Sequence, residues 1–129
     1  MKKKILIVDD EKDTRDTLEE ILIDEGYQTF AALSGRSALM KVKKNKPDLV
    51  LLDIKMPKMD GIEALNRIKK INKHVGVIMI TAFGALDTAK DAMRLGAYDY
   101  ITKPFDMILI KTVVKEALAE KKKKGKEIQ

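Results

Sequence analysis

The chain has 129 residues, of which 45% are hydrophobic and 36% charged, and it contains no cysteine. This length allows one compact core and is too short for two ordinary domains. The lack of cysteine excludes disulfides, thiolate metal sites and cysteine nucleophiles, and agrees with a reducing compartment. No apolar run approaches the roughly 20 residues that cross a bilayer, and the N-terminus does not have the pattern of a signal peptide. We therefore expect a one-domain cytoplasmic protein without a membrane segment, in which oxygen atoms hold any metal.

The net charge of +6 is concentrated at the C-terminus. Residues 121–129 hold five Lys and one Glu, so residues 1–120 carry 21 basic and 19 acidic side chains and a net charge of +2. This balance argues against direct nucleic-acid binding by the body of the protein. We divide the chain into a domain at 1–120 and a lysine-rich tail at 121–129, and interpret the tail as a solvated helix end rather than a nucleic-acid contact.

Short apolar runs predict five strands, at residues 5–8, 28–31, 49–52, 75–80 and 98–101. Between them, apolar residues recur at helical spacing within 18–25, 38–42, 62–68 and 89–93, and a last helix is expected from 107 toward 123. Parallel strands need helical crossovers, so this alternation predicts an α/β fold: a doubly wound, five-stranded parallel sheet with five helices.

The residues that follow these strands form a chemically coherent set: Asp9 and Asp10, then Asp53, then Thr81 and Ala82, then Thr102 and Lys103. Ligands of open α/β sheets bind at the carboxyl ends of the strands, so we expect this set to form one site. Three converging carboxylates repel one another unless a hard cation such as Mg²⁺ joins them. Lysine and hydroxyl groups suit phosphoryl oxygens, and a carboxylate can be a nucleophile that forms an acyl phosphate. Asp53, which ends the most apolar run, is the best candidate for that nucleophile.

Each of these residues alone has a simpler interpretation. Asp9 or Asp10 fits a helix N-cap, Thr81 a strand-end cap and Lys103 a surface base. Their occurrence at the ends of successive strands of one fold favours a metal and phosphoryl site instead.

Four segments make residues 3–120 resemble the receiver domain of two-component response regulators. They are residues 5–11 (ILIVDDE), 47–61 (PDLVLLDIKMPKMDG), 80–82 (ITA) and 96–105 (GAYDYITKPF). The resemblance implies a flavodoxin-like sheet with strand order 2-1-3-4-5. It also implies a protein that accepts a phosphoryl group from a sensor histidine kinase or a histidine phosphotransfer protein and signals to an unknown downstream target.

The resemblance also assigns a role to each acidic residue. Asp53 is the phosphoacceptor, and Asp9, Asp10, Asp53 and the backbone carbonyl of Lys55 hold Mg²⁺, for which Mn²⁺ can substitute. A cation at position 55 could shield the acyl phosphate from water. From Lys55 and Phe83 beside the site, we hypothesise that hydrolysis of the acyl phosphate is slow.

The remaining site residues, again by resemblance, bind the phosphoryl group or respond to it. Thr81, Ala82 and Lys103 contact the phosphoryl oxygens, and the Lys103–Pro104 peptide bond is cis. Thr81 is drawn toward the phosphoryl group, and Tyr100 turns into the vacated space. A plain core or surface role for the Tyr100 ring is the alternative.

Two other functions share features with this sequence. A haloacid dehalogenase-type phosphatase also uses an Asp nucleophile with Mg²⁺, but it needs a second Asp two residues later, where this chain has Lys55. The other alternative is the N-terminal regulatory module of a longer DNA-binding response regulator. The sequence as given has no DNA-reading element, which favours a stand-alone receiver, monomeric or a weak phosphorylation-dependent dimer. We expect it to catalyse only its own phosphorylation and dephosphorylation, and so not to be a turnover enzyme.

Within the family, the resemblance divides between two groups. Residues 26–30 and 46 onward are most similar to single-domain receivers of the chemotaxis and sporulation phosphorelay type, whereas residues 96–105 are equally similar to receivers of nitrogen-regulation-type activators. If the chain belongs to a phosphorelay, a helical histidine protein docks over the first helix near Thr14 to Leu18. Substitution of Arg15 or Leu18 would then slow transfer from that protein but not from a small-molecule donor.

Overall fold

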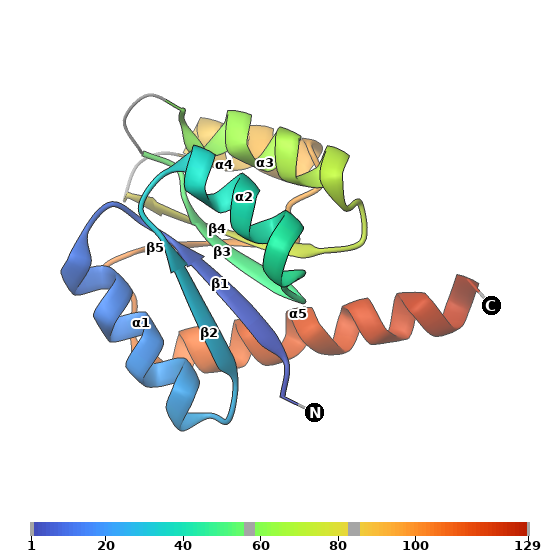
Figure 1. Ribbon diagram of the computed structural model, residues 1–129, viewed down its shortest axis with the longest axis horizontal. Helices are drawn as coiled ribbons and strands as arrows, with labels where there is room; N and C mark the ends of the chain where they lie inside the picture. Colours follow the sequence, from blue (N-terminus) through green and yellow to red (C-terminus); the bar gives the residue numbers. More distant parts are fainter. Residues whose placement is uncertain (1, 56–58, 83–85, 129) are drawn as a thin grey trace.

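The computed structural model describes residues 2–55, 59–82 and 86–128, and strands and helices alternate along this part of the chain (Figure 1). The strands are β1 (Lys4–Val8), β2 (Gln28–Ala32), β3 (Leu49–Asp53), β4 (Gly76–Ala82) and β5 (Asp99–Lys103). The helices are α1 (Lys12–Asp24), α2 (Gly35–Asn45), α3 (Gly61–Ile71), α4 (Leu86–Arg94) and α5 (Met107–Ile128). All strand pairs are parallel and the order is β2-β1-β3-β4-β5, which confirms the expected fold.

The sheet lies between two layers of helices, with α2, α3 and α4 on one face and α1 and α5 on the other (Figure 1). Successive side chains of a strand point to opposite faces, so each buried strand supplies both layers. Leu6 and Val8 of β1 belong to the core beneath α2, α3 and α4, whereas Ile5 and Ile7 belong to the core beneath α1 and α5. Burial of each such side chain contributes about 1.5–3 kcal/mol, which is why the central strands read as unbroken apolar runs.

Polar side chains begin three of the helices. The Ser34 hydroxyl accepts a hydrogen bond from the backbone N–H of Ser37 at the start of α2. Asp60 does the same for Glu63 at the start of α3, and Asp106 for Leu109 at the start of α5. These caps satisfy backbone donors that a helix leaves unpaired in its first turn, and they fix where the loops after the strands end.

Two strands continue two residues further than the sequence pattern predicted. We expected β4 to end at residue 80 and β5 at residue 101, but they end at Ala82 and Lys103. The reason is the parallel ladder, in which Thr81 pairs with Thr102 and Ala82 with Lys103. Polar residues that look like loop residues in the sequence thus belong to the sheet.

The helices differ from expectation in two places. Helix α5 continues past Lys123 to Ile128, consistent with the good helix propensity of Lys and Glu. Met93, which has helical spacing with the buried Ala89 and Ala92, is 40% exposed. No helix in the part of the chain that the structure describes has the length and apolar character needed to cross a bilayer.

Candidate functional site at the carboxyl edge of the sheet

Three carboxylates meet at the carboxyl edge of β1 and β3. Asp9 directly follows β1, Asp10 comes next in the chain, and Asp53 is the last residue of β3. Each offers an oxygen within 4.8 Å of the others. The side chains of Asp9 and Asp53 are only 2% and 7% exposed, and Asp10 lies at the surface. The arrangement therefore has two buried acids and one acid that opens the cluster to solvent.

Asp9, Asp53 and Lys103 point to the same side of the sheet because of strand periodicity. Each lies two positions after a residue of the core beneath α1 and α5, and residues two positions apart in a strand point to the same face. These core residues are Ile7, Leu51 and Ile101. Since β4 separates β3 from β5, the long side chain of Lys103 is needed to reach the acids.

Lys103 is the cation of this cluster. Its Nζ atom donates a hydrogen bond to Oδ2 of Asp9 at 3.2 Å and lies 3.6 Å from Oδ2 of Asp53 and 3.8 Å from Oε1 of Glu11. Burial would lower the pKa of Lys103, but the charges of Asp53 and Asp9, the hydrogen bond to Asp9 and the charge of Glu11 together raise it above its ordinary value. The lysine is therefore charged, and its single charge is shared among the acids.

The ionised form of Asp53 is disfavoured in this cluster. Burial and the negative charge of Asp9 raise its pKa to about 6, against the lowering effects of Lys103 and of the hydrogen bond from the Lys55 N–H. A further cation beside Asp53 would favour its ionised, nucleophilic form.

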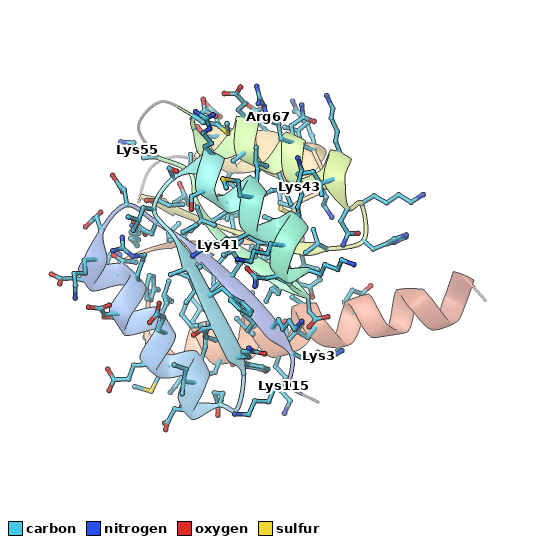
Figure 2. All side chains as sticks on the ribbon, viewed as in Figure 1. Lys3, Lys41, Lys43, Lys55, Arg67 and Lys115 are labelled. Atoms are coloured by element: carbon cyan, nitrogen blue, oxygen red, sulfur yellow. The ribbon has the colours of Figure 1, made fainter. Side chains whose placement is uncertain are left out.

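The backbone after each acidic strand folds back onto the carboxylate. The N–H of Glu11 donates to Oδ1 of Asp9 at 2.9 Å, and the N–H of Lys55 donates to Oδ1 of Asp53 at 3.1 Å. Both bonds fix a carboxylate through the residue two positions later, a common arrangement for Asp. Lys55 is exposed, and Figure 2 shows its side chain pointing away from the sheet. The backbone carbonyl of Lys55 as a metal ligand stays a prediction.

The residues predicted to bind or sense the phosphoryl group lie on β4 and β5. Thr81 is 1% exposed near the end of β4, one position after Ile80, the register partner of Asp53. Tyr100 is half-buried against the core beneath α2, α3 and α4. Tyr100 pairs with Met79, two positions before Thr81, so Thr81 and Tyr100 are diagonal neighbours on one face of the sheet. The Lys103–Pro104 bond is cis.

Gly61 is a site-forming residue to which the sequence analysis gave no role. Its N–H donates to the Ile54 carbonyl at 2.8 Å, and a Cβ added at Gly61 would lie 2.5 Å from the Asp53 carbonyl oxygen and 2.5 Å from Cα of Ile54. Only glycine allows this close approach. The sequence signal was the Asp60-Gly61 pair, a helix cap followed by a residue with no side chain.

The predicted docking face on α1 needs a correction. Leu18 belongs to α1, and its side chain is fully buried in the core between this helix and the sheet. It therefore cannot contact a partner, and its predicted role as a docking residue was wrong. Nη1 of Arg15 donates to the backbone carbonyl of Asp9 at 2.9 Å. Arg15 is therefore connected to the acidic cluster, a contact the sequence did not indicate.

Four residues named in the sequence analysis lie outside the described residues. They are positions 56–58 of the segment after Asp53, and Phe83. The part of the slow-hydrolysis hypothesis that rests on Phe83 therefore has no structural test.

Comparisons with known proteins show what the whole chain is similar to. A family model for the response regulator receiver domain matches residues 5–115. Sporulation initiation phosphotransferase F of Bacillus subtilis (strain 168) is 50% identical over 118 residues, which is 92% of this chain and 95% of that protein. Regulatory protein AtoC of Escherichia coli (strain K12) is 43% identical over 115 residues, which is 89% of this chain but 25% of that protein.

Solved structures of receiver-containing proteins are also similar to this chain. NtrX from Brucella abortus superposes with a TM-score of 0.94 at 41% identity, over 98% of this chain and 29% of that one. The receiver domain of NtrX alone superposes with a TM-score of 0.87 at 43% identity, over 89% of this chain and 98% of that one. The chain thus spans nearly all of some relatives and about a quarter of others.

Proposed function

This chain belongs to the response regulator receiver domain family, and we propose on that basis that it accepts a phosphoryl group onto Asp53. The observation that carries the proposal is the position of Lys103, with its Nζ 3.2 Å from Asp9 and 3.6 Å from Asp53 in a cluster that also contains Asp10. A buried carboxylate with a lysine and two further acids beside it provides a nucleophile, a phosphoryl-binding cation and oxygen ligands for a metal.

The donor set of the acidic cluster fits Mg²⁺. Asp9, Asp10 and Asp53 present carboxylate oxygens only, and one of the three is exposed, as suits a hard cation that keeps several waters. The three carboxylates would hold the ion together with the backbone carbonyl of Lys55. When bound there, Mg²⁺ would offset the negative charge of the carboxylates and of the transferring phosphoryl oxygens.

The chain's own residues divide the transfer step among them. A carboxylate oxygen of Asp53 attacks the phosphorus of a phosphohistidine, so that the O–P bond forms as the N–P bond breaks and the histidine nitrogen keeps the electron pair. Lys103 shifts from the carboxylates to a phosphoryl oxygen, and the Thr81 hydroxyl donates to another. Hydrolysis of the acyl phosphate returns Asp53 and inorganic phosphate. Because Asp53 is itself the acceptor, we propose that the protein catalyses only its own modification.

The output step follows from the positions of Thr81 and Tyr100. They are diagonal neighbours on the face of the sheet beneath α2, α3 and α4. A shift of Thr81 toward the phosphoryl group would open space that the half-buried Tyr100 ring can enter, which would change the surface formed by α4, β5 and α5.

We propose a histidine kinase or a histidine phosphotransfer protein as the donor. Similarity over 95% of a protein named sporulation initiation phosphotransferase F favours a stand-alone receiver that exchanges phosphoryl groups with other proteins. Similarity to one quarter of Regulatory protein AtoC supports the second candidate, the regulatory module of a longer regulator. Transfer of the phosphoryl group from the phosphorylated chain to a second histidine protein would favour the stand-alone receiver.

The testing experiment is intact-mass measurement after incubation with acetyl phosphate and Mg²⁺. One added phosphoryl group is expected on the wild type, and none on Asp53→Ala or in the presence of a chelator. An adduct that persists on Asp53→Ala would overturn the assignment of Asp53. If the folded wild type shows no adduct, a titration with beryllofluoride, which mimics the acyl phosphate, separates fast hydrolysis from an inactive site.

A further inference from the structure

Arg15 holds the peptide group that joins two of the three carboxylate residues. Its Nη1 atom donates to the carbonyl oxygen of Asp9 at 2.9 Å, and that carbonyl belongs to the peptide bond between Asp9 and Asp10. The backbone N–H of Arg15 also donates to the Glu11 carbonyl at 3.1 Å. Arg15 is thus attached at two points to the loop between β1 and α1.

Within the part of the chain that the structure describes, Asp9 has further hydrogen bonds that hold it, whereas the side chain of Asp10 has none. The Asp9 N–H donates to the Ala32 carbonyl at 3.2 Å, and its two carboxylate oxygens accept from the Glu11 N–H and from Lys103. Asp10 is exposed, and its side chain has no hydrogen-bond or ion-pair partner among the described residues. The direction of the Asp10 side chain therefore depends on the orientation of the peptide group before it.

We propose that Arg15 is a positioning residue for the metal site. By fixing the peptide between Asp9 and Asp10, it keeps the Asp10 carboxylate within reach of Asp9 and Asp53. This inference rests on the proposed function, because it assumes that the acidic cluster binds Mg²⁺. Groups that hold metal ligands in place commonly change metal affinity by about 10–100-fold when they are removed.

The positive charge of Arg15 and its hydrogen bond to the Asp9 carbonyl have opposite effects on Mg²⁺ affinity. Its positive charge stands near a cation site, so loss of the charge alone would make Mg²⁺ binding tighter. Loss of the hydrogen bond to Asp9 would release Asp10 and make binding weaker. The direction of the change in Mg²⁺ affinity therefore distinguishes a positioning role from a purely electrostatic one.

The test is calorimetric titration with Mg²⁺ of the wild type, Arg15→Met and Arg15→Lys, with Lys12→Met as the matched control. Lys12 lies in the first turn of the same helix, is exposed and pairs with Asp16 at 2.7 Å, so its loss removes one positive charge and no bond to Asp9. We expect the Mg²⁺ dissociation constant to rise about 10-fold in Arg15→Met, to rise in Arg15→Lys, which keeps the charge, and to stay unchanged or fall in Lys12→Met. Unchanged or tighter binding in both Arg15 variants would overturn the proposal.

Acceptance of the phosphoryl group from acetyl phosphate gives a second readout. Arg15→Met should need about 10-fold more Mg²⁺ for half-maximal phosphorylation and should reach the wild-type rate at saturating Mg²⁺. A loss that appears only with a protein donor and is independent of Mg²⁺ would indicate docking and overturn positioning. If the wild type itself neither binds Mg²⁺ nor gains a phosphoryl group on Asp53, it is the proposed function that fails.

Discussion

Nζ of Lys103 lies 3.6 Å from Oδ2 of Asp53, although β4 separates the strands that carry the two residues. Each residue stabilises the charged form of the other against burial. Lys103 also bonds Asp9, so one positive charge serves two buried acids. Without a metal, the cluster therefore has an excess of negative charge.

The first prediction concerns removal of that positive charge. Lys103→Met should lower the free energy of unfolding of the chelated protein by roughly 1–3 kcal/mol, because the two buried carboxylates keep their backbone hydrogen bonds but lose the positive charge beside them. Added Mg²⁺ should recover most of this loss, since the ion replaces the missing charge. Urea unfolding with chelator and with Mg²⁺ measures both effects.

The control for Lys103 is Lys115→Met, which removes a charge from the exposed side of α5 (Figure 2). It should change stability by less than about 0.5 kcal/mol. If Lys103→Met lost the same stability with and without Mg²⁺, the loss would come from packing and the electrostatic argument would not hold.

The second prediction is a pH dependence that originates at Asp53. Folding raises its pKa from 3.8 to about 6, so between these values the folded state binds more protons at this group than the unfolded state. The contribution of Asp53 to stability therefore falls as the pH rises through this window, and the penalty is complete above about pH 6. Asp53→Asn removes the ionisable group and should stabilise the chelated protein at neutral pH by on the order of 1–3 kcal/mol.

Thermal unfolding of chelated wild type and Asp53→Asn across this pH range measures the effect. The two proteins should converge in stability below about pH 4, where the wild-type group is protonated in both states. Asp16→Asn, which changes an exposed acid on α1, should not reproduce this convergence. A stability difference between wild type and Asp53→Asn that is the same at all pH values would contradict the assignment of the penalty to Asp53.

The fold was predictable because unbroken apolar runs alternate with segments of helical period, and parallel strands buried on both faces need helical connections. The runs at residues 5–8 and 49–52 became β1 and β3, each one residue longer. The convergence of Asp9, Asp10 and Asp53 also followed from the sequence, since the carboxyl ends of adjacent parallel strands share one edge.

The sequence could not predict contacts that depend on the reach of a long side chain or on how closely two backbone segments approach each other. The bond from Arg15 to the Asp9 carbonyl depends on the angle between α1 and the preceding loop, which no residue pattern encodes. The docking role given to Leu18 was wrong although the sequence held the signal against it, because Leu18 belongs with Ile21 and Leu22 to the apolar stripe of α1, and that stripe faces the core. The ends of β4 and β5 were placed too early because the ladder holds polar residues that have weak strand signals.

The third prediction concerns the close approach of α3 to the phosphoacceptor strand. Gly61→Ala would place a methyl group 2.5 Å from the Asp53 carbonyl oxygen and from Cα of Ile54, so the backbone of one segment must move. We expect a loss of stability of about 1–3 kcal/mol and a lower rate of phosphorylation by acetyl phosphate, because the shift displaces Asp53.

Gly26→Ala is the comparison for Gly61. Gly26 has φ +92° but nothing within 4 Å of an added Cβ, so alanine there should reduce stability through backbone strain alone. Its phosphorylation rate should match the wild type while the protein is folded. If both glycine variants slow phosphorylation equally, general destabilisation accounts for the effect, and the contact between Gly61 and Asp53 does not.

The last prediction concerns the lifetime of the acyl phosphate. The N–H of Lys55 donates to Asp53, which places this residue beside the acceptor, while its exposed side chain points away from the sheet (Figure 2). A negatively charged phosphoryl group on Asp53 would attract this ammonium group, which would then hinder the approach of water. Lys55→Ala should therefore shorten the lifetime several-fold. Intact mass at intervals after desalting measures the decay, with Lys70→Ala on the distal turn of α3 as the control. A wild-type adduct that decays within seconds, or an equal lifetime in Lys55→Ala, would contradict shielding by Lys55.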